Sequence, residues 1–187
     1  HREKLLKIYS WTKSYKSRYP QLYTQVLFEL LTNGLELESY NMDHFIEYLT
    51  LPGVYHSYQK MSAMPYSSNH PNDSDWISVL GFNTSRYKSI DELSQTYLGH
   101  FFTAAKDIKP FDQYYEATFL ERIFYEVKLQ LGHSFPDISR VLNPHEIKAL
   151  NDAKEITILQ NDVEYFKHGD DVKLRVRIKN IPKLLVK

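Results

Sequence analysis

The residues best suited to chemistry lie in one irregular stretch, between positions 55 and 76. It contains two histidines, His56 and His70, and two aspartates, Asp73 and Asp75. Imidazole nitrogens and carboxylate oxygens bind metals, and a histidine also exchanges protons near neutral pH. The stretch therefore supports one hypothesis, that the chain is an enzyme or metal-binding subunit with its site in this loop.

Two acidic motifs have simpler interpretations than metal binding. Residues 72–75, Asn-Asp-Ser-Asp, offer closely spaced oxygens, but the glycine and glutamate that complete a calcium-binding loop are missing. Gly169-Asp170-Asp171 is typical of a tight turn before a strand. The sequence also lacks H-E-x-x-H, G-x-S-x-G and glycine-rich phosphate-binding motifs. It therefore assigns no catalytic residue and no cofactor.

Composition argues against several classes of protein. Lys and Arg together number 23, as do Asp and Glu, so the chain has no overall charge that would attract nucleic acid. Cysteine is absent, which excludes disulfides and thiolate chemistry. No apolar run approaches the ~18 residues that a membrane span requires. Fifteen tyrosines and ten phenylalanines suit either helix packing or protein interfaces. The compartment does not follow from these features.

The segment expected to organise the core is a helix over residues 109–132. Leu120, Phe124, Val127 and Leu131 recur at helical spacing, and Gly132 suits a left-handed residue that ends a helix. Before it, Ser89 begins an S-x-x-E capping box.

Further helices are predicted on both sides of this pair. They cover residues 3–17, 22–33, a short segment capped by Asn41 or Asp43, and residues 143–153, where Asn143-Pro-His-Glu is a strong helix start. Lysines in the first of these helices permit nucleic-acid binding, but a solvated helix face explains them better. The irregular loop at 53–88 separates the third helix from the fourth.

The character of the chain changes after residue 154. Ile156 and Ile158 favour a strand, and residues 173–179 alternate strictly, with Leu174, Val176 and Ile178 on one side. This alternation predicts antiparallel strands with one face turned to a core.

The tail from Tyr165 to Lys187 resembles the opening of a macroglobulin-type β-sandwich domain. In relatives of alpha-2-macroglobulin, a Y-F-x-x-G-D-x-V turn leads into an alternating strand, then K-N and a second strand; here residues 165–172 and Lys179-Asn180 match. The resemblance implies a multi-domain surface or secreted protein that works by binding. No catalytic residue carries over.

The sequence thus predicts an α+β chain. Residues 1–153 form a mainly helical domain of antiparallel helices, and residues 154–187 form the first strands of an incomplete β-sandwich. The leading functional hypothesis is a non-enzymatic interaction or scaffolding module of a larger protein, because the chain is neutral, rich in tyrosine, has a long irregular loop and has no catalytic constellation. Its opening at His1 and its strand-like close suggest a fragment of a longer protein or a processed one. Its expected partner is another protein or its own downstream domains, without nucleic acid and without a membrane span. The alternative is the enzyme or metal-binding subunit described first.

Overall fold

The computed structural model describes residues 2–54, 56–60, 89–159, 168–169, 175–181 and 183. These residues are mainly helical, with one small antiparallel sheet. They fall into two compact units, residues 1–124 and 125–187. The predicted boundary at 153/154 falls between the last helix and the first strand. That it divides two domains stays a prediction.

Six α-helices and two strands make up the regular structure of the described residues. Their bounds are α1 (Arg2–Ser14), α2 (Pro20–Glu36), α3 (Met42–Leu49), α5 (Ile90–Ala104), α6 (Ala117–Gln130), α7 (Pro144–Asp152), β1 (Glu155–Leu159) and β2 (Arg175–Lys179).

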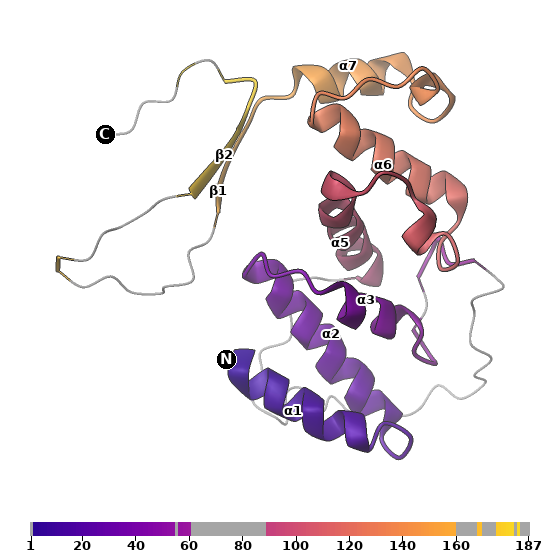
Figure 1. Cartoon of the computed structure of the whole chain (residues 1–187), viewed down its shortest axis with the longest axis vertical. Helices are drawn as coiled ribbons and strands as arrows, with labels where there is room; N and C mark the ends of the chain where they lie inside the picture. The colour runs from indigo at the N-terminus through magenta and orange to yellow at the C-terminus, as the bar shows by residue number, and fades with distance from the viewer. Residues whose placement is uncertain are drawn as a thin grey trace. The chain divides into compact units, whose positions relative to one another are not determined.

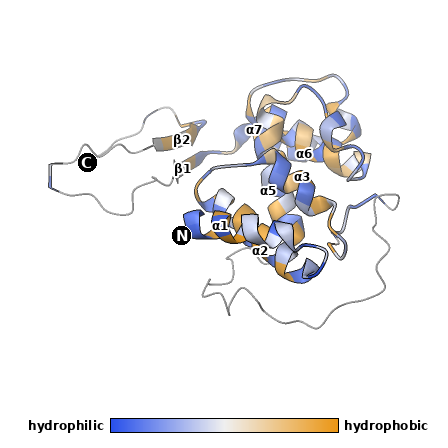
Figure 2. Cartoon of the chain, turned by 60° about the horizontal axis from the view of Figure 1, so that its bottom comes forward, coloured by the Kyte–Doolittle hydropathy of each residue, from blue (hydrophilic) through white to orange (hydrophobic). Residues whose placement is uncertain are grey.

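Helices α1 and α2 form an antiparallel pair joined by a short turn, and α3 packs on α2 (Figure 1). Helix α1 turns Leu5, Tyr9 and Thr12 inward at the 3–4 residue spacing of one helix face. Its other residues are largely exposed, and hydrophilic and hydrophobic residues intermingle along it (Figure 2). Two of the apolar residues of this helix, Leu6 and Trp11, have exposed side chains.

Helix α2 is longer than predicted at both ends. Pro20 lies before the predicted range of 22–33, but it occupies the first turn of the helix, where its missing N–H costs nothing. At the other end, the helix continues past the predicted end at residue 33 to Glu36. Gly34 makes room for Tyr97 against this last turn, because a Cβ there would lie 2.7 Å from the Tyr97 hydroxyl oxygen.

Aromatic rings fill the centre of the first unit. Phe45 of α3 stacks on Tyr97 of α5 with ring centroids 4.9 Å apart, and Phe102 meets Phe111 and Phe124 edge to face. The Tyr97 hydroxyl donates to the Leu31 carbonyl of α2. Buried rings of this size supply most of the apolar burial that holds such a core together.

Three predicted helix caps are confirmed. Asn41 accepts from the His44 amide, and Ser89 accepts from the Glu92 amide. Asn143 and Glu146 form a complete capping box. Each cap satisfies amide groups that the first turn of a helix leaves without partners.

The central helix is shorter than the sequence suggested. Residues 109–111 form a 3-10 turn, and Tyr115 pairs with Gln59 in an isolated β-bridge, so α6 begins only at Ala117. Leu120 and Phe124 are buried as predicted, but Leu131 is 50% exposed. Gly132 has φ +82° and directly follows the last turn, as expected for a helix end.

The second unit carries the only sheet of the described residues. β1 and β2 pair antiparallel, with Ile156 opposite Ile178. Lys179, the last residue of β2, donates to the Leu150 carbonyl near the end of α7. The side-chain amide of the next residue, Asn180, donates to the Ala153 carbonyl at 2.8 Å. These bonds tie the end of β2 to the end of α7.

The described residues show two strands and no β-sandwich. Ile156 and Ile178 are 50% and 44% exposed, so the alternating face is not turned to a core there. Leu174 of the predicted strand at 173–179 lies outside the described residues, as do residues 184–187 of the second strand that the macroglobulin resemblance implied. Alternation identifies a strand correctly, but it does not say what covers the strand.

Candidate functional site

A groove opens in the first unit where the end of α1, the start of α2 and α3 meet. Its volume is about 720 Å³, within the range of ligand-binding pockets. Its walls combine apolar and polar side chains, namely Lys16, Ser17, Pro20, Tyr23, Thr24, Asp43, Ile46, Glu47, Thr50, Leu51 and Pro52.

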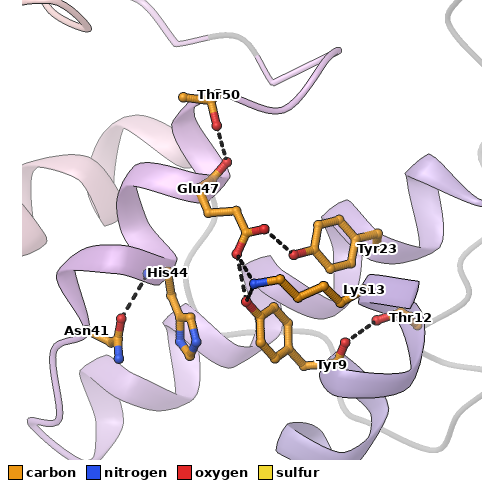
Figure 3. A network of polar contacts seen from close by, with 8 residues as sticks. All are labelled: Tyr9, Thr12, Lys13, Tyr23, Asn41, His44, Glu47 and Thr50. Carbon is orange, nitrogen blue, oxygen red and sulfur yellow. Dashed lines mark hydrogen bonds and ion pairs between the residues drawn. The ribbon is translucent and has the colours of Figure 1, made fainter. Parts of the chain in front are cut away.

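The Glu47 carboxylate joins the three helices beside this groove (Figure 3). One oxygen, Oε1, accepts from the Tyr23 hydroxyl of α2 at 2.6 Å. The other, Oε2, accepts from the Tyr9 hydroxyl of α1 at 2.6 Å and from the Lys13 ammonium at 3.3 Å. Lys13 also donates to the Tyr9 oxygen at 2.9 Å, which closes the network.

This network favours an ionised carboxylate. Partial burial alone would raise the pKa of Glu47, but the hydrogen bonds from Tyr23, Tyr9 and Lys13 outweigh it and hold the pKa below its ordinary value. The hydrogen bond that Lys13 donates to the Tyr9 oxygen raises the pKa of Lys13, although slight burial opposes it. Burial, reinforced by the bond to Glu47, raises the pKa of Tyr23 far above its usual range. All three groups keep their ordinary charge near neutral pH.

The groove is better suited to binding than to acid–base catalysis. A general acid or base needs a pKa near the working pH and a proton that is free to move. Glu47 instead has a lowered pKa and is bonded to three donors, so it holds α1, α2 and α3 together. What the groove offers a partner is its shape, its apolar walls and fixed polar groups.

A second surface lies on the outer side of α1. Lys4, Lys7 and Trp11 are spaced three and four residues apart and are exposed, on the side away from the buried Tyr9. Trp11 is 55% exposed, and its ring centroid lies 5.3 Å from that of Tyr15, which is 45% exposed. We call Lys4, Lys7, Trp11 and Tyr15 the aromatic–basic face.

His56 is the one predicted site residue that the structure describes. It is buried against the Tyr115 ring, with centroids 4.3 Å apart, and neither ring nitrogen has a hydrogen-bond partner. Burial lowers the pKa of His56 to about 4, although the negative charge of Asp91 acts to raise it. Asp91 itself accepts from the backbone amide and the hydroxyl of Ser57. His56 is therefore a neutral core residue at pH 7, next to a small hollow at the start of α5.

The other three predicted ligands, His70, Asp73 and Asp75, lie outside the described residues, and so the loop site stays a prediction. Among the residues that are described, no group of three His, Cys, Asp or Glu side chains could hold a metal ion. Over the same residues, no helix has the length and hydrophobicity to span a membrane.

Sequence reasoning missed both surfaces. Glu47 sits in the apolar run Phe45–Leu49, and an acid in such a run is a signal that it has partners. Nothing in the sequence pairs it with Tyr9 and Tyr23, because those contacts depend on how three helices pack. The exposure of Trp11 could have been found from the helical wheel, since residues two apart, such as Tyr9 and Trp11, lie on nearly opposite sides of a helix.

Comparison with known proteins gives a consistent result over the helical region. A family model described as the actin-binding protein F N-terminal domain matches residues 1–154. Actin-binding protein F of Dictyostelium discoideum is 31% identical over 99 residues, which is 52% of this chain and 4% of that protein. The chain thus corresponds to a small part of its curated relative. No solved structure matches it.

The resemblance to a macroglobulin-type domain was wrong. The matching family is a different one, and its model ends at residue 154, before the Tyr165–Lys187 segment that suggested the macroglobulin fold. A glycine–aspartate turn followed by an alternating strand is common to many β-structures and is a poor guide to family. From its match over most of the chain, we conclude that this protein belongs to the family of actin-binding protein F N-terminal domains.

Proposed function

We propose that this domain is a non-catalytic protein-binding module of a larger protein, and that actin is its partner. The observation that carries the proposal is the match of residues 1–154 to the N-terminal domain of actin-binding protein F. The Dictyostelium relative, which is named for actin binding and of which this chain covers 4%, supports the proposal of a longer protein.

The geometry of the first unit supports binding in two ways. The groove beside Glu47 is open and has apolar walls, but its carboxylate is committed to Tyr9, Tyr23 and Lys13. The aromatic–basic face exposes a tryptophan and a tyrosine, and aromatic residues are enriched where proteins meet. Both features offer shape and contact area to a partner.

Co-sedimentation with actin filaments tests this function. The 187-residue chain is mixed with increasing filament concentrations at about physiological salt, and the pelleted fraction is measured. We expect the pelleted fraction to rise with filament concentration and to saturate. An excess of unlabelled chain should displace labelled chain from the filaments. Microtubules at the same mass concentration serve as the control polymer, because they are also acidic filaments. A chain that stays in the supernatant at all filament concentrations, or that pellets equally with microtubules, would refute actin as the partner.

A further inference from the structure

We propose that the aromatic–basic face of α1 is the surface through which this domain binds its protein partner, and that it fits an acidic patch with an apolar centre. The inference rests on the proposed function and adds the chemistry of the contact. It concerns the outer side of α1, whereas the groove lies at the end of the helix.

The buried residues of α1 lie on another side of the helix from Trp11. Leu5, Tyr9 and Thr12 anchor the helix from the opposite side, at 0%, 7% and 2% exposure. Trp11 gains little from folding, because more than half of its surface stays in water. An exposed tryptophan beside an exposed tyrosine is therefore available to fill an apolar hollow on a partner, as residues that dominate interface energies do.

The charge around these rings is strongly one-sided. Residues 2–18 contain six Lys or Arg and a single acid, Glu3, although the whole chain is balanced at 23 and 23. Of the six, Lys13 is engaged with Glu47. In the turn after α1, Arg18 lies over the Tyr19 ring at 5.5 Å. Such a local excess of positive charge attracts the acidic surface of a partner and orients it during approach.

The pattern favours a protein over a membrane. A helix that lies in a membrane surface buries a broad apolar face in lipid. The apolar face of α1 is already packed in the core of the first unit. The apolar side chains exposed outside that face are Leu6, Trp11 and Tyr15, and they lie among lysines and serines. This pattern suits a confined apolar contact with charged surroundings.

The pattern also favours a protein over nucleic acid. Nucleic-acid binding draws on many phosphate contacts and commonly on a net positive domain. Here the chain is neutral overall, and the charged stretch contains two arginines, Arg2 and Arg18. One of these, Arg2, donates to Ser39 at 3.0 Å within the domain.

Matched charge reversals and a tryptophan truncation test the proposal with three probes: actin filaments, phosphatidylserine vesicles and a 20-base-pair DNA duplex. The face variants are Trp11→Ala and Lys4→Glu/Lys7→Glu. The control variant, Lys106→Glu/Lys109→Glu, makes the same charge change on exposed lysines outside α1. Because all these side chains are exposed, we expect every variant to fold. Circular dichroism and the melting temperature verify this.

We expect Trp11→Ala to weaken filament binding about tenfold, the effect of losing one interface anchor. The double charge reversal should weaken binding by a similar factor and reduce its salt dependence, and the control should stay within about twofold of the unchanged chain. If the unchanged chain binds filaments and all variants bind equally, the face is not the contact surface, although the proposed function stands.

If the unchanged chain does not bind filaments, the proposed function fails, and polyglutamate-coated resin then decides the chemistry of the face. Retention that the face variants lose and the control keeps would support an acidic protein partner. Equal retention of all variants, or face-dependent binding to vesicles or DNA without retention on the resin, would overturn the proposal.

Discussion

Removal of the Glu47 carboxylate should destabilise the first unit, because side chains of α1 and α2 would lose the hydrogen-bond acceptor that they share on α3. In Glu47→Ala, the Tyr9 and Tyr23 hydroxyls lose bonds of 2.6 Å each. These two tyrosines are 7% and 0% exposed, so neither ring can move freely into water. Lys13 loses a 3.3 Å ion pair, but its side chain is half exposed and remains hydrated.

The size of the effect follows from these exposures. Leaving a buried hydroxyl without its partner costs about 1–3 kcal/mol. An ion pair with one exposed member contributes about 0–1 kcal/mol. The groove borders both Glu47 and Tyr23, so water can replace part of the lost hydrogen bonding. We therefore expect the free energy of unfolding to fall by about 2–4 kcal/mol, below the sum of the upper limits.

Urea unfolding followed by far-ultraviolet circular dichroism measures this change. Glu92→Ala removes an exposed carboxylate from α5 and serves as the control, with an expected change within about 1 kcal/mol. A double-mutant cycle with Tyr9→Phe should give a coupling of about 0.5–3 kcal/mol, because the residues share a hydrogen bond. A Glu47→Ala protein as stable as the control, or a coupling near zero, would refute the view that this network holds α1 to α3.

Three further substitutions probe the core. Burial, and secondarily the charge of Glu36, raises the pKa of Glu29 to about 7; the stability of the fold should therefore be complete below pH 4.5 and decline as the pH rises through 7. Glu29→Gln should remove this decline and be more stable at pH 8 by about 1–3 kcal/mol in urea unfolding; an unchanged pH profile would contradict this. Burial lowers the pKa of His56 to about 4, so stability should be complete above pH 6.5 and fall as the pH drops toward 4; His56→Phe should flatten that slope in melts at pH 4–7, and a slope equal to that of the unchanged chain would count against it. Gly34→Ala should lower stability by about 1–3 kcal/mol in thermal melts, because the new Cβ meets the Tyr97 hydroxyl oxygen at 2.7 Å; an equal or higher melting temperature would show that the contact relaxes.

Local features of this chain could be predicted well because they depend on near neighbours. Asn41, Ser89 and Asn143 cap helices that begin within one residue of where the sequence places them. Gly132 ends α6 as its lack of a side chain suggests. These outcomes follow from short-range hydrogen bonding and backbone sterics, which a sequence states directly.

Features that depend on packing could not be predicted in the same way. The start of α6 moved to Ala117 because Tyr115 pairs with Gln59, a residue far away in the chain. The Tyr9–Glu47–Tyr23 network joins positions up to 38 residues apart. The exposure of Trp11 was open to prediction from helical spacing, but assigning it to a partner surface also required knowing that Tyr9 and Leu5 face inward.

Site-specific photo-crosslinking tests most directly whether this domain binds actin through α1. A benzophenone amino acid replaces Trp11 in one sample and exposed Lys106 in another, and each is irradiated with actin filaments. The account predicts a covalent adduct with actin from position 11 and little from position 106. No adduct from position 11, or equal adducts from both positions, would contradict it.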